Sequence, residues 1–209
     1  MSSDQENSAV EFQFIPPRSL QAGWLSCRLI EADDADRLYE AVMTSIDHLR
    51  PWMPWVNDYR REMADEFVGN ALEALLGRSV NEANYVSTDS EDNLLGVFGL
   101  HARLGPGALE IGYWVDVRRT RRGVATLSAA LLAEAALSIN DVDNVEIHHD
   151  EANLASEAIP ARLGFERYAS IHLEPDASGE VGIQVNWRMN RSNWPSSEAA
   201  RLLAMLRRG

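Results

Sequence analysis

Residues 110–126, EIGYWVDVRRTRRGVAT, contain the change of conformation that decides the fold. The first half is a mixture of β-branched and aromatic residues on a period of two, which is typical of a strand. After Gly123 the residues are helix formers, and their apolar face is wide enough to pack against a sheet. Four arginines, at positions 118, 119, 121 and 122, separate the two parts. The stretch therefore predicts a strand, a basic turn and the start of a helix.

Such a turn is suited to bind an anion. The first N–H groups of a helix have no partner within the helix and carry the positive end of its dipole, so phosphate oxygens can accept hydrogen bonds from them. Gly123 would let the main chain come close, and a flanking arginine can hold a phosphate through two N–H groups. The alternative is an ordinary surface turn with solvated arginines.

Composition limits the size and organisation of the protein. The chain has 209 residues, of which 45% are hydrophobic, so it can bury one good core. We expect a disordered N-terminus over residues 1–10, a single domain over residues 11–190 and a helical extension over residues 191–209.

Charge and cysteine content limit the partners. The formal net charge is −13, and all 19 basic residues are arginine. Nucleic acids and anionic membranes need broad basic surfaces, so we expect neither as a partner. Cys27 is the only cysteine, which excludes an internal disulfide and fits a reducing compartment. With no signal peptide and no apolar run of about 18 residues, we expect a soluble, cytoplasmic protein.

The rest of the chain predicts short strands interrupted by helices. Turn signals separate strands at 84–88, 94–101 and 109–115, which indicates an antiparallel meander. The strand at 145–149 follows a long helix, so it should run parallel to 109–115 after a right-handed crossover. Further strands are predicted at 25–30, 165–172 and 181–189, and helices at 31–46, 62–76, 121–139, 153–163 and 196–206. Asn153 should cap its helix, and Gly164 should end it.

Three ordered motifs, EIGYWV, RRGVAT and DEANLASEAIPARLGF, resemble the GNAT superfamily of N-acetyltransferases. The branch that they resemble is that of the ribosomal-protein N-terminal acetyltransferases, the RimJ/RimL type, and the resemblance covers about residues 25–189. It implies the α/β (α+β) fold of that family: a mixed, mostly antiparallel central sheet with a splayed parallel strand pair and helices on both faces.

The resemblance also implies a site for acetyl-CoA. In the family, main-chain N–H groups of the strand–turn–helix bind the pyrophosphate, in a pattern of Gln or Arg, two residues, Gly, one residue, and Gly or Ala. Gly123 and Ala125 match this pattern, whereas Thr120 departs from it and Arg121 replaces a frequent glycine. The pantetheine arm is expected in the gap of the splayed pair, beside a free N–H near Trp114. The expected contacts are Trp114, Val115, Val117, Arg118, Arg122, Gly123, Val124, Ala125, Thr126, Asn153 and Ser156.

Acetyl transfer needs a group that accepts the proton of the amine and a group that protonates the leaving thiolate. Glu110, which opens the strand beside the turn, is the candidate base, and the alternative is a strand carboxylate in a salt bridge. Many relatives have a tyrosine where this chain has Pro160, which cannot donate a proton, so the resemblance passes the acid role to Ser156. The alternative for Ser156 is a helix residue that makes only local bonds. Pro160 should also bend or open the helix.

The acceptor is expected on the side of a loop that relatives use for this purpose. The resemblance assigns it His48, Trp52, Trp55 and, from the strand, Tyr113. Alternatively, the tryptophans only fill the core between two helices. His148 and His149 are adjacent on a strand and point to opposite faces, so they cannot share a metal ion, and no metal is expected.

Two functions of different classes follow. The first is an acetyl-CoA-dependent N-acetyltransferase that works through a ternary complex on a primary amine, either a protein N-terminus or a small molecule. The second is a non-catalytic acyl-CoA-binding or oligomeric regulatory protein with the same fold. The expected partners are acetyl-CoA, an amine acceptor and, as an option, a second copy of the chain in a homodimer.

Overall fold

The computed structural model describes residues 12–77 and 79–208. The predicted disorder of residues 1–10 lies outside this range. In the described part of the chain, no helix has the length and apolar character needed to cross a membrane.

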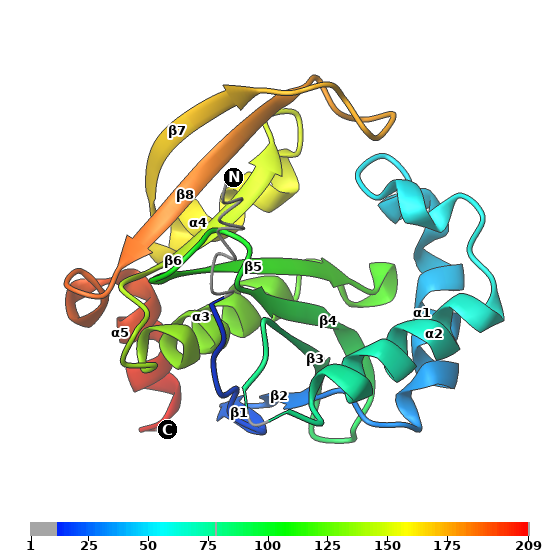
Figure 1. Cartoon of the computed structure of the whole chain (residues 1–209), viewed down its shortest axis with the longest axis horizontal. Coiled ribbons are helices and arrows are strands. Elements are labelled where there is room, and N and C mark those ends of the chain that lie inside the picture. The colour runs from blue at the N-terminus through cyan, green and yellow to red at the C-terminus, as the bar shows by residue number, and fades with distance from the viewer. Residues whose placement is uncertain (1–11, 78, 209) are drawn as a thin grey trace, which may run out of the picture.

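One eight-stranded sheet forms the centre of the protein (Figure 1). Its strands are β1 (Ser19–Ala22), β2 (Leu25–Leu29), β3 (Glu82–Thr88), β4 (Leu94–His101), β5 (Ala108–Val115), β6 (Asn144–Asp150), β7 (Glu166–His172) and β8 (Ile183–Asn190). Their order across the sheet is β1-β2-β3-β4-β5-β6-β8-β7. Neighbouring strands are antiparallel except β5 and β6, which are parallel. The predicted mixed, mostly antiparallel sheet is confirmed.

The parallel pair is short, and this opens the sheet. β5 and β6 pair only through Ala108–Asn144, Leu109–Val145 and Glu110–Glu146. Beyond Glu110, β5 stays beside β4, whereas β6 stays beside β8. Figure 1 shows the two strands diverging from this point. The sheet therefore forms a V, as expected of a splayed parallel pair.

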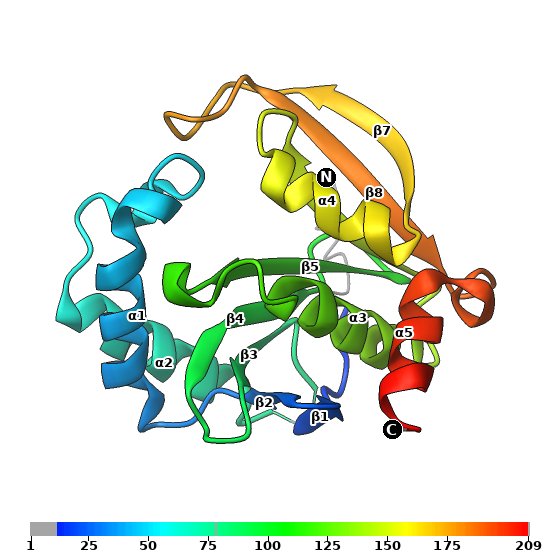
Figure 2. The same cartoon turned by 180° about the vertical axis from the view of Figure 1, so that it is seen from behind.

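Helices cover both faces of the sheet, as predicted (Figures 1 and 2). On one side lie α1 (Asp34–Leu49) and α2 (Arg61–Ala74), joined by a loop that contains the 3₁₀ turn Pro54–Val56. On the other side lie α3 (Val124–Leu137), α4 (Leu154–Leu163) and α5 (Glu198–Leu206). α3 is buried on nearly every side because the sheet, α4 and α5 surround it.

The side chains of β5 alternate between these two layers. Ile111 and Tyr113 pack in the cluster that contains α3, so we call their side the α3 face. Trp114 packs in the clusters of α1 and its neighbouring loop, so we call the opposite side the α1 face. Because successive side chains of a strand point to opposite faces, Glu110 and Gly112 also lie on the α1 face.

The sequence interpretation missed β1, which is short and half polar, and misplaced some ends. The long helix begins at Val124 rather than at residue 121, because Arg121 and Gly123 have left-handed φ angles of 60° and 80°. The last strand begins at Ile183 rather than at residue 181. The C-terminal helix packs on the main core, where Leu203 is fully buried.

A buried carboxylate joins β2 to the start of α1. Asp34 is 0% exposed, and its two oxygens accept hydrogen bonds of 2.7 Å from the guanidinium of Arg28. One of them also accepts from the main-chain N–H of Glu31 at 2.8 Å. Burial by itself would raise the pKa of Asp34, but these hydrogen bonds and the charges of Arg28 and Arg37 outweigh it and lower the pKa.

We expect Asp34→Ala to lower the free energy of unfolding by about 3 kcal/mol at neutral pH, because Arg28 loses its buried partner. The loss should shrink in acid, since a carboxyl with a lowered folded-state pKa contributes above its unfolded pKa and stops contributing once it is protonated. Denaturant unfolding at several pH values measures this. Asp33→Ala is the matched control, because Asp33 is exposed and makes no capping bond. Equal losses in the two variants would contradict the prediction.

Candidate active site

The turn between β5 and α3 presents an open helix N-terminus. Gly123 occupies the N-cap position of α3, no side chain caps this end, and its first turn has no acidic residue. A Cβ built on Gly123 would meet nothing within 4 Å. The N–H groups of Val124, Ala125 and Thr126 therefore start a helix whose positive end is available to an anion. Arg121, with φ at 60°, holds a conformation that costs a non-glycine residue energy.

The arginines of the turn differ in what they bind. The guanidinium of Arg118 bonds to the buried carboxylate of Asp116 and to Glu40. These hydrogen bonds, that of Asp116 first, raise the pKa of Arg118. Its side chain is thus engaged within the protein, so the expected phosphate contact by Arg118 would need these bonds to break. Arg122 is exposed and makes no ion pair with the described residues, so it is the better phosphate candidate.

Main-chain groups of β5 face the gap of the V. The N–H of Asp116 donates to the carbonyl of Leu95 beside β4, at 2.9 Å. Because the main-chain groups of successive residues point to opposite edges of a strand, the N–H of Trp114 also turns toward β4. The main-chain N–H groups of Tyr113 and Val115 turn toward the gap. The free N–H that was expected near Trp114 therefore belongs to its two neighbours.

Tyr113 and Ser156 form a hydroxyl pair on the α3 face. The phenol oxygen of Tyr113 lies 3.0 Å from Ser156 Oγ and 3.4 Å from the Ser156 carbonyl oxygen. That carbonyl has no helical donor, because Pro160 lacks an N–H, so Tyr113 supplies the missing bond. α4 remains an α-helix through Pro160, so the helix does not end there, and a bend at this residue stays a prediction. Burial raises the pKa of Tyr113 to about 12, although the bond with Ser156 lowers it.

The remaining predicted contact on α4 is Asn153, which caps the helix as predicted. Asn153 is the N-cap of α4, and its Oδ1 accepts a hydrogen bond from the N–H of Ser156 at 3.1 Å. Gly164 ends the helix with a φ angle of 81°. Asn153 thus fixes the first turn of α4, where Ser156 lies, and its contact with pantetheine stays a prediction.

Glu110 lies on the α1 face as one of several paired carboxylates. It is 6% exposed, and the Nε and Nη2 groups of Arg103 donate to its two oxygens. His148 Nδ1 lies 3.7 Å from Glu110 Oε2, while His148 Nε2 lies 2.6 Å from Glu146 Oε2. The salt-bridge alternative therefore describes Glu110 in this structure. As a base it would have to compete with Arg103 for its own lone pairs.

Besides His148 of its own strand, Glu146 has partners from elements distant in the sequence. It accepts hydrogen bonds from Tyr168 at 2.7 Å and from the guanidinium of Arg188 at 2.6 and 2.8 Å. Burial would raise its pKa, but the bonds from His148, Tyr168 and Arg188 outweigh burial and lower the pKa to about 2. Arg103, Glu146 and Arg188 were not among the residues predicted from the sequence. Strand alternation was the available signal, because it places Glu110, Glu146 and Arg188 in one row across the sheet.

The expected acceptor residues divide between the two faces. Trp55 is 40% exposed and lies 6.5 Å from the Trp114 ring on the α1 face, with Trp52 in the same loop. His48 is not in the loop but in the last turn of α1, where it is exposed. Tyr113 lies on the α3 face, opposite Trp114 and beside Ser156, and its role at the acceptor stays a prediction.

The loop of the tryptophans reaches across the open side of the V. The N–H of Gly179, between β7 and β8, donates to the carbonyl of Pro51 at 2.8 Å. Figure 1 shows these two loops approaching each other above the sheet. This hydrogen bond connects the two arms of the V on the α1 side of the gap.

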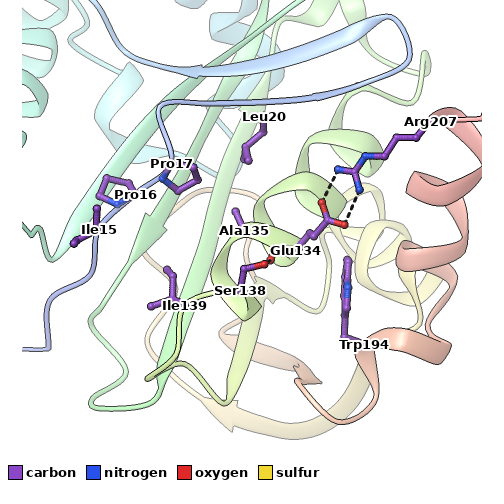
Figure 3. Close-up of a pocket in the computed structure, with 10 residues that line it drawn as sticks. All are labelled: Ile15, Pro16, Pro17, Leu20, Glu134, Ala135, Ser138, Ile139, Trp194 and Arg207. Atoms are coloured by element: carbon purple, nitrogen blue, oxygen red, sulfur yellow. Dashed lines mark hydrogen bonds and ion pairs between the residues drawn. The ribbon is translucent and has the colours of Figure 1, made fainter.

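A surface hollow of about 630 Å³ lies elsewhere, between the N-terminal segment and the C-terminal ends of α3 and α5 (Figure 3). Its lining includes the Glu134–Arg207 ion pair and Trp194, and none of the predicted site residues. We place the candidate site at the V because the donor groups and hydroxyls converge there. In the described residues, no cluster of three potential metal ligands is present.

Comparison with known proteins identifies the family of this chain. The model of the acetyltransferase (GNAT) domain matches residues 25–166, so the chain belongs to the GNAT acetyltransferase family. Among curated proteins, it is 27% identical over 155 residues to "Putative ribosomal N-acetyltransferase YdaF" of Bacillus subtilis (strain 168). That match covers 68% of this chain and 77% of the relative.

Solved structures of the family share the fold. RimL, a ribosomal L7/L12 alpha-N-protein acetyltransferase in complex with coenzyme A, has a TM-score of 0.74 at 18% identity, over 82% of this chain and 97% of RimL. Mycobacterium smegmatis RimJ, in complex with CoA-disulfide, has a TM-score of 0.74 at 19% identity, over 94% of this chain and 96% of RimJ. At these identities, the likeness shows the fold.

The open space at Gly123 allows a direct test of the anion site. We expect Gly123→Glu to weaken coenzyme A binding by at least about 100-fold, because a carboxylate would occupy the place of the phosphates. Gly105→Glu is the matched control. Gly105 also has a positive φ, of 93°, and open space, but it lies at the other end of β5. Calorimetry with coenzyme A should separate the two variants, and equal affinities would remove the phosphate assignment.

Proposed function

We propose that the protein transfers an acetyl group directly from acetyl-CoA to a primary amine while both are bound. The observation that carries the proposal is the open N-terminus of α3 at the mouth of the V, beside the Tyr113–Ser156 hydroxyl pair. Both features border the same gap between β5 and β6. A donor held by its phosphates at one end of this gap would present its thioester to the hydroxyls.

The chain offers groups for each part of the donor. The N–H groups of Val124, Ala125 and Thr126, with Arg122, would bind the pyrophosphate. The main-chain groups of Tyr113 and Val115 would bond the pantetheine arm in the manner of an added strand. Acetyl-CoA would supply the reactive acyl thioester.

The hydroxyl pair would serve the leaving sulfur. The pKa of Tyr113, raised to about 12 by burial, keeps its phenol protonated at neutral pH. When its single proton turns from the Ser156 carbonyl to Ser156 Oγ, the phenol donates to that hydroxyl oxygen, and the Ser156 hydroxyl can donate to a developing thiolate. This assigns the acid role to Ser156 and makes Tyr113 a positioning residue.

The acceptor would approach on the α1 face, between the tryptophan loop and the loop around Gly179. We propose a protein N-terminal α-amine as the acceptor class. YdaF is named a putative ribosomal N-acetyltransferase, and RimL a ribosomal L7/L12 alpha-N-protein acetyltransferase. A net charge of −13 also favours encounter with a basic peptide rather than with an acidic one. Such a substrate would place the enzyme in the cytoplasm.

The second candidate, an acyl-CoA-binding protein without turnover, shares the same donor site. Pro160 in place of a tyrosine favours it, and the Tyr113–Ser156 pair favours the enzyme, because a tyrosine from β5 reaches the same helix. The two candidates differ in whether thiol is released.

We expect release of free thiol from acetyl-CoA in the presence of short basic peptides with N-terminal serine or alanine. Thiol detection over time measures this, and mass spectrometry of the peptide should show the added acetyl group. Spermidine and an N-terminally blocked peptide serve as comparisons. If coenzyme A binds but no amine releases thiol, the non-catalytic candidate holds.

We expect Ser156→Ala to lower kcat by about 10- to 100-fold, because the leaving thiolate loses its proton donor. The affinity for coenzyme A should change less than about threefold, since the main-chain carbonyl of residue 156 keeps its bond to Tyr113. Steady-state kinetics and calorimetry measure both quantities. Ser192→Ala, an exposed serine after β8, is the control. An unchanged kcat would leave Ser156 as a helix residue only.

A further inference from the structure

A row of ionisable residues crosses the α1 face where the V begins. In the strand register, His101 of β4 lies opposite Glu82 of β3 on one side and Glu110 of β5 on the other. Glu110 is also the last residue of β5 that pairs with β6. His101 is therefore adjacent to the point where the two strands part.

The imidazole of His101 is oriented by a carboxylate. His101 Nδ1 lies 3.4 Å from Glu82 Oε2, and the other oxygen of Glu82 accepts a hydrogen bond of 2.6 Å from Asn84 Nδ2. Interaction with His101 is the largest cause that lowers the pKa of Glu82 to about 2, with Asn84 adding to it against burial. Glu82 is thus an anion that faces Nδ1. With the ring proton on Nδ1, the lone pair is on Nε2.

Two glycines, which have no side chain, provide the space that the His101 ring occupies. Gly99 and Gly112 face each other across β4 and β5, in the row next to His101. A Cβ on Gly99 would overlap Nε2 of His101, and a Cβ on Gly112 would lie 3.2 Å from it. Nε2 therefore lies over Gly112. Gly112 belongs to the part of β5 that no longer pairs with β6. Any other residue at Gly99 would displace the imidazole.

The other candidate bases on this face are already engaged. Arg103 donates to both oxygens of Glu110. Each ring nitrogen of His148 faces a carboxylate, Glu110 or Glu146. His101 Nε2, by contrast, makes no hydrogen bond with the described residues, and the side chain keeps 17% of its surface exposed. Of these groups, only His101 can take a proton without breaking an existing bond.

We propose that His101, oriented by Glu82, accepts the proton of the acceptor amine. The inference rests on the proposed function. The amine nitrogen forms a bond to the thioester carbonyl carbon, and its proton passes to Nε2 of His101. The carbon–sulfur bond breaks, and the sulfur leaves with the electron pair and is protonated from the side of Ser156. The imidazolium then returns its proton to solvent, and Ser156 takes back a proton from solvent, so that the net products are the amide and the free thiol.

The charges around His101 suit this role. Glu82 from β3 and Glu110 from β5 flank the ring, and Arg103 and His148 are the further charged or titratable groups of the same network. Glu82 is a positioning residue, because it acts through the imidazole. Glu110 and Arg103 neutralise each other beside it.

The first test is His101→Gln, with an N-terminal serine peptide as the acceptor. We expect kcat to fall about 100-fold or more, KM values for peptide and acetyl-CoA to change less than about threefold, and the acid limb of the kcat profile to disappear. His172→Gln, on the exposed strand β7, is the control and should behave as wild type. A lower kcat with an unchanged pH profile would mean a structural role and overturn the proposal.

A second readout, which does not depend on turnover, and a second variant test the orientation of the ring. Nitrogen-15 NMR of the histidine rings should show the neutral tautomer of His101 with its proton on Nδ1. In Glu82→Gln kcat should fall about 10-fold while the KM values change less than about threefold, because the imidazolium that forms during turnover loses its negative partner. A ring with its proton on Nε2, or an unchanged kcat in Glu82→Gln, would overturn the proposal.

These outcomes distinguish a failure of the proposed function from a failure of the base assignment. Wild type without thiol release from any amine would end the proposed function, whatever the tautomer of His101. Wild-type turnover that His101→Gln retains within about threefold would end only the assignment of the base.

Discussion

The structure depends on the early separation of β5 and β6. Three residue pairs hold the two strands together, and then each strand follows a different neighbour. A strand in the middle of a sheet normally has partners on both sides for its main-chain groups, and buried groups of this kind need a partner. Tyr113 and Val115 face a gap instead. The separation thus creates an extended row of donors and acceptors at the centre of the molecule.

The separation also divides the proposed chemistry between two faces. The α3 face has the open end of α3, the capped first turn of α4 and the hydroxyl pair of Tyr113 and Ser156. The α1 face has the tryptophan loop and the row that includes His101 and Glu110. A thioester in the gap would be reached from one face by the amine and from the other by the group that protonates sulfur. Apart from the tryptophan loop, these groups come from strands and helices of the core.

The arginines of this acidic protein differ in whether they are bonded to a buried carboxylate. Arg28, Arg103, Arg118 and Arg188 each bond to a buried carboxylate. Such pairs fix registers and turns, because a buried carboxylate without its partner would be costly. Arg122 has no such bond in the described part of the chain and lies next to the open helix end. Position relative to buried acids, rather than the number of arginines, therefore distinguishes the arginine that we propose for phosphate from those with a structural role.

The sequence alone determined the strand–turn–helix at residues 110–126, the alternation of β5, the cap at Asn153 and the end of α4 at Gly164, because these follow from local periodicity and from the conformations that glycine and asparagine adopt. Only the tertiary structure decided which side chains meet. Tyr113 and Ser156 are 43 positions apart, and Arg118 and Glu40 are 78 apart. The ring of His101 lies over two glycines of neighbouring strands, and Pro51 touches Gly179 across the V. Such contacts depend on strand register and on the angle between the two arms of the sheet, which are set by the packing of the whole core and not by any local pattern.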